Sequence, residues 1–451
     1  MPRFVLPLVL TLSACMPVTP PDIASRTKIG ESTLPPMKVF GGRVQPRRAI
    51  SNAELAADFL DLSFQLESGR ALPVFTRFDG PISVRVTGAA PASLAPDLTR
   101  LLARLKSEAG IAIQTTNSAA ASITIEAVSR AEIRRALPEA ACFVAPNVSS
   151  LAEYRKNRRS SRTNWTLLQT RTKLAIFLPN DASPQEVRDC LHEELAQAIG
   201  PLNDLYRLPD TVFNDDNVHT VLTGFDMLIL RAYYAPELAS GMTRNEVAAR
   251  LPAILSRINP AGRARPTQPP SVTPREWSNA IQTALGHGTK RTARRNAAVT
   301  ALRIAADRGW QDHRTGFAHY AMGRILQASD PDAAQAHYLA ADRYYAGSSL
   351  TQLHRAYVAT QLAAFAISEG RGRDALRRIE PHIPIVSASE NAALLSTLLL
   401  LRAEALELEN RFAEARSVRL DSLGWARYGF GPDWAVRAKQ REVASLNPLN
   451  G

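Results

Sequence analysis

The chain is 451 residues long, and 45% of its residues are hydrophobic and 21% are charged. This length exceeds what one ordinary core accommodates, so we expect two or more domains, and the composition excludes wholesale disorder. The formal net charge is +12, from 54 basic and 42 acidic residues. A positive field favours anionic partners. Lipid headgroups and cell-wall polymers are such anions, so the charge does not by itself indicate nucleic acid.

The first residues have the order of a secretory signal. A basic start is followed by an apolar run and by Leu12-Ser-Ala-Cys15, which is the pattern of an export signal that ends at a small-residue cleavage site. The tetrad resembles the bacterial lipobox, which implies that residues 1–15 are a lipoprotein signal peptide and that Cys15 is lipidated. The alternative, a short buried helix, is disfavoured because Pro7 interrupts a run that is too short to span a bilayer.

The lipobox resemblance also implies a location. Everything after Cys15 would lie outside the cytoplasm, held to a membrane by several lipid chains. Met16 stands where an aspartate would usually signal inner-membrane retention, so we expect a periplasm-facing lipoprotein of the outer membrane. Such a location excludes a helical-repeat transcription regulator. The sequence has no phosphate-binding glycine loop and no nucleophile elbow, so nothing in it supports ATP binding.

Two proline-rich stretches divide the chain. Residues 16–49 have little apolar periodicity and are typical of a semi-rigid tether, and residues 260–275 are typical of a linker. Between these stretches, residues 50–259 alternate between helix-like and strand-like patterns. We therefore expect an α+β domain there, followed by an all-α domain over residues 276–451.

The periodicity of the first domain predicts individual elements. Helices are expected at 53–66, 94–108 and 184–199, and strands at 82–86, 111–114, 123–128 and 174–178. The helix at 184–199 has Ser183 as a plausible N-cap and Pro184 at its first position. This helix is the most informative part of the chain.

Two cysteines remain after Cys15. Cys142 and Cys190 are an even pair in what we expect to be an oxidising compartment, so we predict that they form a disulfide. Closing a loop of that length stabilises a fold by about 4 kcal/mol in the chain-entropy model. The alternative is two buried free thiols.

The segment from Cys190 to Asp204 resembles a zinc-peptidase motif. It reads Cys-Leu-His-Glu-Glu-Leu-Ala-Gln-Ala-Ile-Gly-Pro-Leu-Asn-Asp, which is similar to the metzincin motif His-Glu-x-x-His-x-x-Gly-x-x-His in a shifted register. In that register Glu193 takes the position of the first ligand, Glu194 that of the general base, Gln197 that of the second ligand, Gly200 that of the turn glycine and Asn203 that of the third ligand.

The resemblance continues downstream. Residues 211–214 lie where metzincins have the tight turn under the metal, with Phe213 in place of the methionine, and residues 222–226 and 230–234 resemble the final helix of matrixin-like domains. The resemblance implies a metzincin-like domain. Residues 50–260 are also similar to an uncharacterised family of bacterial envelope proteins with a Cys-x-His-Glu-Glu-Leu-x-Gln-x-Leu-Gly core, in which Ile199 here replaces the last leucine.

Oxygen-bearing side chains occupy all three histidine positions. Glu193, Gln197 and Asn203, with Asp204 beside them, suit calcium, manganese or no metal better than catalytic zinc. His192 lies about 100° around the helix from Glu193, too far to replace the missing ligand easily. Without a Lewis acid, Glu194 has no activated water to deprotonate. We therefore expect a scaffold that has lost zinc hydrolysis and uses no cofactor, the alternative being a divalent metal at this degenerate site.

The helical region contains a repeated small residue. Ala334, Ala375 and Ala415 lie 41 and 40 residues apart, each in the expected second helix of a helical pair. This spacing is typical of stacked helical hairpins and resembles tetratricopeptide repeats. The alternative is an irregular helical bundle.

These features together predict a membrane-anchored envelope lipoprotein that acts as a non-catalytic interaction scaffold. The repeats would bind an envelope protein or peptide, the basic surface could also meet anionic lipid or cell-wall polymer, and no nucleic acid is expected. The alternative is an atypical metal-dependent peptidase or hydrolase of the cell envelope, with Glu194 as its general base.

Overall fold

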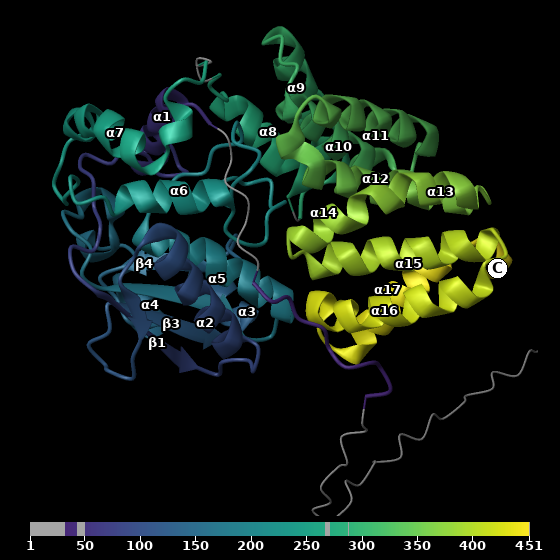
Figure 1. The fold of residues 1–451 in the computed structure, drawn as a ribbon, viewed down its shortest axis with the longest axis horizontal. Helices are drawn as coiled ribbons and strands as arrows, with labels where there is room; N and C mark the ends of the chain where they lie inside the picture. The colour runs from purple at the N-terminus through teal and green to yellow at the C-terminus, as the bar shows by residue number, and fades with distance from the viewer. Residues whose placement is uncertain (1–31, 43–49, 267–270, 287, 451) are drawn as a thin grey trace, which may run out of the picture. The chain divides into compact units, whose positions relative to one another are not determined.

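The structure, a computed structural model, describes residues 32–42, 50–266, 271–286 and 288–450. Cys15 and the expected signal peptide lie outside the described residues. From Leu34 onward the chain belongs to one compact unit. Within it, a mixed α/β region is followed by a region made of helices (Figure 1).

The α/β region contains seven helices that surround one sheet. The helices are α1 (Asn52–Ser63), α2 (Leu94–Arg104), α3 (Arg130–Ala136), α4 (Leu151–Asn157), α5 (Pro184–Ile199), α6 (Gly224–Tyr233) and α7 (Arg244–Ile258). The strands are β1 (Ile82–Gly88), β2 (Ile113–Thr115), β3 (Ile123–Val128), β4 (Phe143–Pro146) and β5 (Leu174–Pro179). A single π-helical turn, Leu105–Ala109, continues α2.

The sheet has the strand order β2-β1-β3-β5-β4. The first four strands of this order are parallel, and β4 pairs antiparallel with β5 at one edge. Side chains of β5 alternate between two cores: Ile176 belongs to the large core formed with α2 and α5, and Phe177 packs with residues of α3 and α4. Burial on both faces explains why β5 reads as a continuous apolar run.

The predicted disulfide is present. Cys142, directly before β4, is bonded to Cys190 in α5, at a sequence separation of 48 residues. The bond therefore attaches the edge of the sheet to the helix that packs against it.

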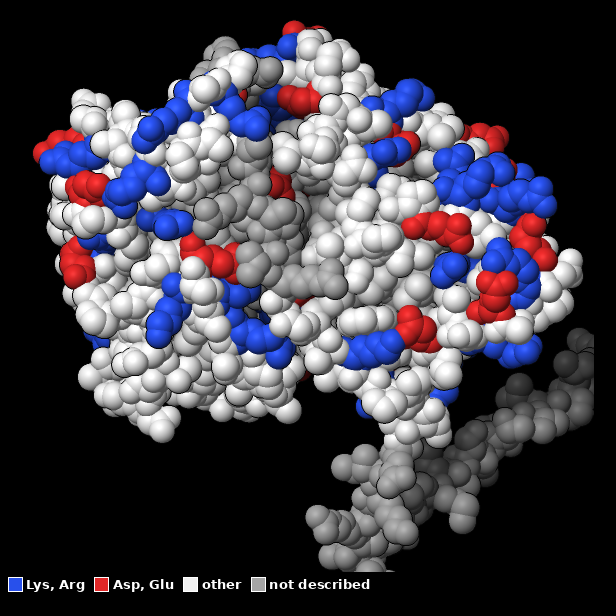
Figure 2. Space-filling view, viewed as in Figure 1, with Lys and Arg blue, Asp and Glu red and all other residues white. Residues whose placement is uncertain are grey.

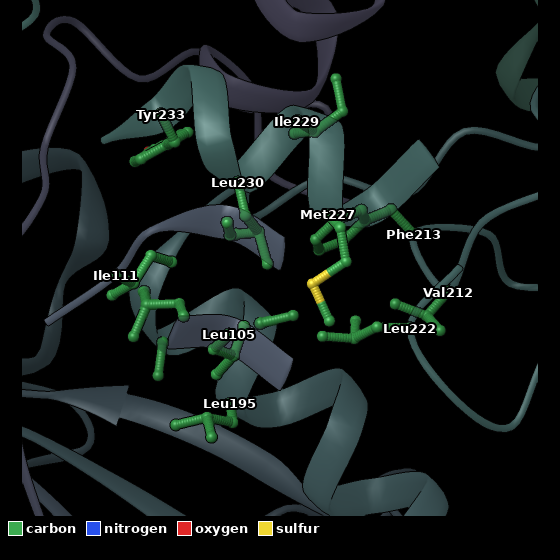
Figure 3. Close-up of a cluster of buried hydrophobic side chains, with 14 of the residues drawn as sticks. Leu105, Ile111, Leu195, Val212, Phe213, Leu222, Met227, Ile229, Leu230 and Tyr233 are labelled. Carbon is green, nitrogen blue, oxygen red and sulfur yellow. The ribbon is translucent and has the colours of Figure 1, made fainter. Parts of the chain in front are cut away.

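The large core continues on the other side of α5. Figure 3 shows Leu195 of α5 below a cluster that contains Leu230 of α6, Leu105 of the π-helical turn, and Phe213. Gly200 ends α5 at this core, where a Cβ atom would lie 2.5 Å from a methyl carbon of Leu230 and 2.9 Å from the carbonyl oxygen of Ala196. Glycine is therefore required for the close approach of the two helices.

The second region is built from helices joined by short turns. They are α8 (Arg275–Leu285), α9 (Arg291–Asp307), α10 (His313–Leu326), α11 (Pro331–Ala346), α12 (Gln352–Ser368), α13 (Gly372–Ile379), α14 (Ile383–Ala388), α15 (Ala392–Leu408), α16 (Phe412–Phe430) and α17 (Asp433–Ala444). None of the helices in the described part of the chain is long and apolar enough to cross a membrane.

The three spaced alanines each lie between paired helices. Ala334 is in α11, Ala375 in α13 and Ala415 in α16, and all three side chains are fully buried. Each of these helices packs against the helix before it, as α10 with α11, α12 with α13 and α15 with α16. The expected helical hairpins are thus present, while α14 is an additional helix between the second and third pairs.

Part of the expected tether is packed rather than free. Phe40 stacks on Trp425 of α16 with ring centroids 4.4 Å apart, and Leu34 packs with Ala426. Lys38 also forms an ion pair with Asp421. Residues 34–40 therefore belong to the folded unit, because their apolar side chains bury surface against α16, and any spacer is shorter than residues 16–49.

Arg171 holds the C-terminal end of α5. Its guanidinium donates hydrogen bonds to the carbonyl oxygens of Gln197, Ala198 and Gly200, at 2.7, 2.8 and 2.6 Å, and the residue is only 2% exposed. The last carbonyls of a helix have no partner within the helix and carry its partial negative charge. One buried cation therefore satisfies the end of α5 and fixes where the chain turns.

Replacing this arginine tests that role. Arg171→Met should lower the free energy of unfolding by about 3 kcal/mol or more, because three buried carbonyls lose their donors, whereas Arg303→Met, on the exposed face of α9, should change it by less than about 0.5 kcal/mol. Urea unfolding followed by circular dichroism measures both. Equal, small effects of the two substitutions would contradict the role.

Candidate functional site

Three side chains of α5 face a cavity of about 660 Å³. Glu193, Glu194 and Gln197 line it together with Glu67, Asp204 and Asp215 from other segments. A second cavity of similar volume shares the last three of these residues and extends to α8. Five carboxylates and one amide thus converge at the position that the sequence motif marks.

The start of α5 is fixed as the sequence predicts. The hydroxyl of Ser183 accepts a hydrogen bond from the backbone N–H of Glu186, and Pro184 occupies the first turn. The helix then spans Pro184–Ile199, which places Glu193 and Gln197 one turn apart on the side of the cavity. Both predicted ligand positions on the helix therefore face one space.

The third predicted ligand is turned away from the other two. The amide of Asn203 donates a hydrogen bond of 2.9 Å to the carbonyl oxygen of Asp61 in α1, and Asn203 does not line the cavity that contains Glu193 and Gln197. Its neighbour Asp204 lines both cavities instead. Asn203 lines only the second cavity, and its hydrogen bond to Asp61 holds it toward α1.

Two members of the cluster were not predicted from the sequence. Glu67 lies in the turn that follows α1, and Asp215 in the loop between α5 and α6. One carboxylate oxygen from each of Glu67, Asp204 and Asp215 lies within 4.8 Å of the other two, and the amide of Gln197 donates a hydrogen bond of 3.2 Å to Glu67. The only sequence signal for Asp215 is the acidic pair that it forms with Asp216.

Burial and mutual repulsion dominate the electrostatics of this cluster. The pKa of Glu193 is raised to about 7, first by burial and then by the charges of Glu67 and Asp215. The pKa of Glu67 is also raised to about 7, first by burial and then by Asp215, although its hydrogen bond from Gln197 opposes this. For Glu194 and Asp204, burial followed by repulsion from neighbouring carboxylates moves the pKa well above the usual range.

Some carboxylate oxygens of the cluster lack a partner. Oε2 of Glu194 and Oδ1 of Asp204 are buried and have no hydrogen-bond partner among the described residues. None of the five carboxylates forms an ion pair with a described lysine, arginine or histidine. The nearby Arg207 pairs with Asp58 and Asp61 instead. Buried charges in proteins are normally paired or coordinate metals, so this cluster is an unusual concentration of acidic groups.

The site does not fit a catalytic zinc ion. Among the described residues, no histidine lines either cavity. His192 is buried on another side of α5, where its Nδ1 accepts a hydrogen bond of 3.1 Å from the backbone N–H of Leu222. Burial, with nearby arginines such as Arg188, holds the pKa of His192 well below its usual value, so this imidazole is a neutral structural group.

The turn beneath the helix is held by Asp226. Its carboxylate accepts hydrogen bonds from the hydroxyl of Thr211 and from the backbone N–H groups of Val212 and Thr223. Phe213 is fully buried, and Figure 3 shows it close to Met227 of α6. Phe213 is therefore a core residue of the turn that leads to Asp215.

A helix of the second region contributes to the cluster. The amide of Gln282 in α8 donates a hydrogen bond of 3.4 Å to Asp215, and the guanidinium of Arg275 hydrogen-bonds to the carbonyl oxygen of Ser68, next to Glu67. The acidic cluster is thus bordered by segments from both regions of the chain.

Part of the chain matches a known family model. Residues 52–253, which include α1 to α6 and the acidic cluster, match a family described as "Protein of unknown function (DUF2927)". No curated protein and no solved structure matches the chain.

Asp226 gives a test of the electrostatics beneath the site. Burial raises its pKa from 3.8 to about 6 despite the hydrogen bonds that it accepts. Because the pKa of Asp226 is higher in the folded state than in the unfolded state, its contribution to the free energy of unfolding is complete below pH 4. That contribution decreases by about 3 kcal/mol as the pH rises through 6.

Comparison with Asp226→Asn isolates this effect. The difference in free energy of unfolding, wild type minus variant, should fall between pH 4 and pH 7, because only the wild type has a carboxyl group at position 226 that titrates there. Urea titrations at each pH measure it, and Asp332→Asn on the surface of α11 serves as a control with a constant difference. A constant difference for Asp226→Asn as well would show that the pKa is not raised.

Proposed function

We propose that the chain is a membrane-anchored envelope lipoprotein that binds partners through a metzincin-like domain without zinc hydrolysis and through tetratricopeptide-like helical hairpins. The observation that carries this proposal is the chemistry of the cavity beside α5. Oxygen-bearing side chains, Glu193 and Gln197 among them, line this cavity, and His192 does not. A helix, a glycine turn at Gly200, a turn at Phe213 and a final helix follow each other in the order expected for a metzincin-like domain.

The helical region supports a binding role. Stacked hairpins bury their apolar faces only against neighbouring hairpins and leave an extended surface for a protein or peptide. The buried alanines at the three pairings, Ala334, Ala375 and Ala415, fit this architecture. The partner in this proposal is an envelope protein or peptide.

The surface charge supports an additional anionic contact. Figure 2 shows lysine and arginine side chains in several groups on the displayed face, with acidic side chains among them. With a net charge of +12, anionic lipid or cell-wall polymer is the proposed secondary partner.

Membrane anchoring is tested with a labelled fatty acid. Cells that express the full chain should incorporate the label into the protein and carry it in the outer-membrane fraction, and Cys15→Ser should abolish both. Cys142→Ser is the matched control, because it removes a different cysteine and should keep the label. Equal labelling of wild type and Cys15→Ser would refute the anchor.

One observation favours a second candidate function, an atypical hydrolase. Glu194 has a buried carboxylate oxygen without a described partner and lines the cavity, as a general base facing a substrate would.

Purified protein is therefore incubated with casein and with peptidoglycan fragments in the presence of zinc, manganese or calcium. Our proposal predicts equal, background cleavage for wild type and Glu194→Gln. Cleavage that falls a hundredfold or more in the variant, with stoichiometric zinc in the wild type, would establish the hydrolase instead.

A further inference from the structure

The carboxylates of Glu67, Asp204 and Asp215 are arranged as a ligand set. Three of their oxygens lie within 4.8 Å of one another. Calcium binds oxygen at 2.3–2.6 Å, so two ligands on opposite sides of one ion are separated by up to about 5 Å. A single ion can therefore contact all three oxygens with little movement of the chain.

The surroundings of the three carboxylates also indicate a cation. Glu194 is 5% exposed, lines the same cavity as the three carboxylates and has an oxygen without a described hydrogen-bond partner. The two arginines that border the cluster are engaged elsewhere, Arg207 with Asp58 and Asp61 and Arg275 with the carbonyl of Ser68. The negative charge therefore has no counter-charge among the described side chains.

We infer that Glu67, Asp204 and Asp215 bind one calcium ion, with Gln197 and Gln282 orienting the first and last of these ligands. The ligands are all oxygens and come from two separate loops, the turn after α1 and the loop between α5 and α6. Such a set suits the flexible, high coordination of calcium better than the strict octahedron of magnesium. The inference goes beyond the proposed function, since neither the anchor nor the repeats require an ion.

The orienting amides connect the ion to both regions. Gln197 of α5 donates to Glu67, and Gln282 of α8 donates to Asp215. The ion thus joins the turn after α1, the loop after α5 and, through Gln282, the first helix of the second region. Calcium should therefore stabilise the whole unit rather than one loop.

Calorimetry on the full chain in detergent, after treatment with EDTA, tests the inference. Titration with calcium chloride should show one ion per chain with a sub-millimolar dissociation constant, a range found for extracellular calcium sites and sensors. Calcium should also raise the melting temperature. Magnesium at the same concentration should bind at least about tenfold more weakly.

The variant Asp215→Asn should lower the calcium affinity by about tenfold or more and remove the calcium-dependent rise in melting temperature. In EDTA it should melt at or above the wild-type temperature, because the substitution removes a repelling charge, whereas a merely structural aspartate would leave the variant less stable. Asp332→Asn, exposed on α11, should bind calcium as the wild type does.

A second variant guards against misfolding of the first. Glu67→Gln changes a residue in the turn after α1 and should also weaken calcium binding about tenfold or more. The inference is overturned if no calcium binds up to millimolar concentrations, if magnesium binds equally well, or if both variants bind calcium like Asp332→Asn.

Discussion

The contact between Arg171 and the end of α5 determines where the rest of the site lies. A helix that ends in a protein interior leaves carbonyl oxygens that must find donors, and here one guanidinium supplies them. Because the end of α5 is fixed, Gly200 sits against Leu230, and the chain leaves the helix in one direction. That direction brings Asp204 to the cluster and sends Asn203 toward α1.

The acidic cluster opposes the folding that this contact promotes. Burial and repulsion from nearby carboxylates raise the pKa of each carboxyl group, so the cluster destabilises the fold when its members are ionised. Proteins retain such groups where binding or chemistry uses them more often than where they serve structure alone. The cluster is therefore a candidate functional site, and its ionised members lower the stability of the fold.

The sequence predicts the elements with strong local signals. The helix at 184–199 has the predicted bounds because its N-cap, its first proline and its final glycine are all local, and β3 is also predicted correctly at 123–128. The strand β4 escapes prediction because four residues give too little periodicity, and its pairing with β5 is non-local. The prediction of a mixed α/β region followed by a helical region is confirmed.

The site was only partly predictable, for a physical reason. Residues on one helix keep a fixed spacing, so Glu193 and Gln197 were found from the motif. Beyond Gly200 a motif no longer fixes which way a side chain points, so the sequence could not distinguish Asn203 from Asp204. Glu67 precedes Glu193 by more than 100 residues in the sequence. Only the folding of α1 against the loop after α5 brings Glu67 near Asp204 and Asp215. Arg171, which holds the C-terminal end of α5, lies in a loop whose sequence has no helical or strand periodicity.

The bond between Cys142 and Cys190 has a consequence for when the pocket becomes complete. Cys142 lines the cavity, and Cys190 precedes Glu193 and Glu194 by one turn of α5. A newly made chain with reduced sulfurs would hold that side of the cavity without a covalent bond, through the pairing of β4 with β5 and the packing of β4 on α5. Completion of the cavity is thereby coupled to oxidation of the two cysteines. In reducing surroundings the acidic groups would line a cavity that lacks this covalent connection.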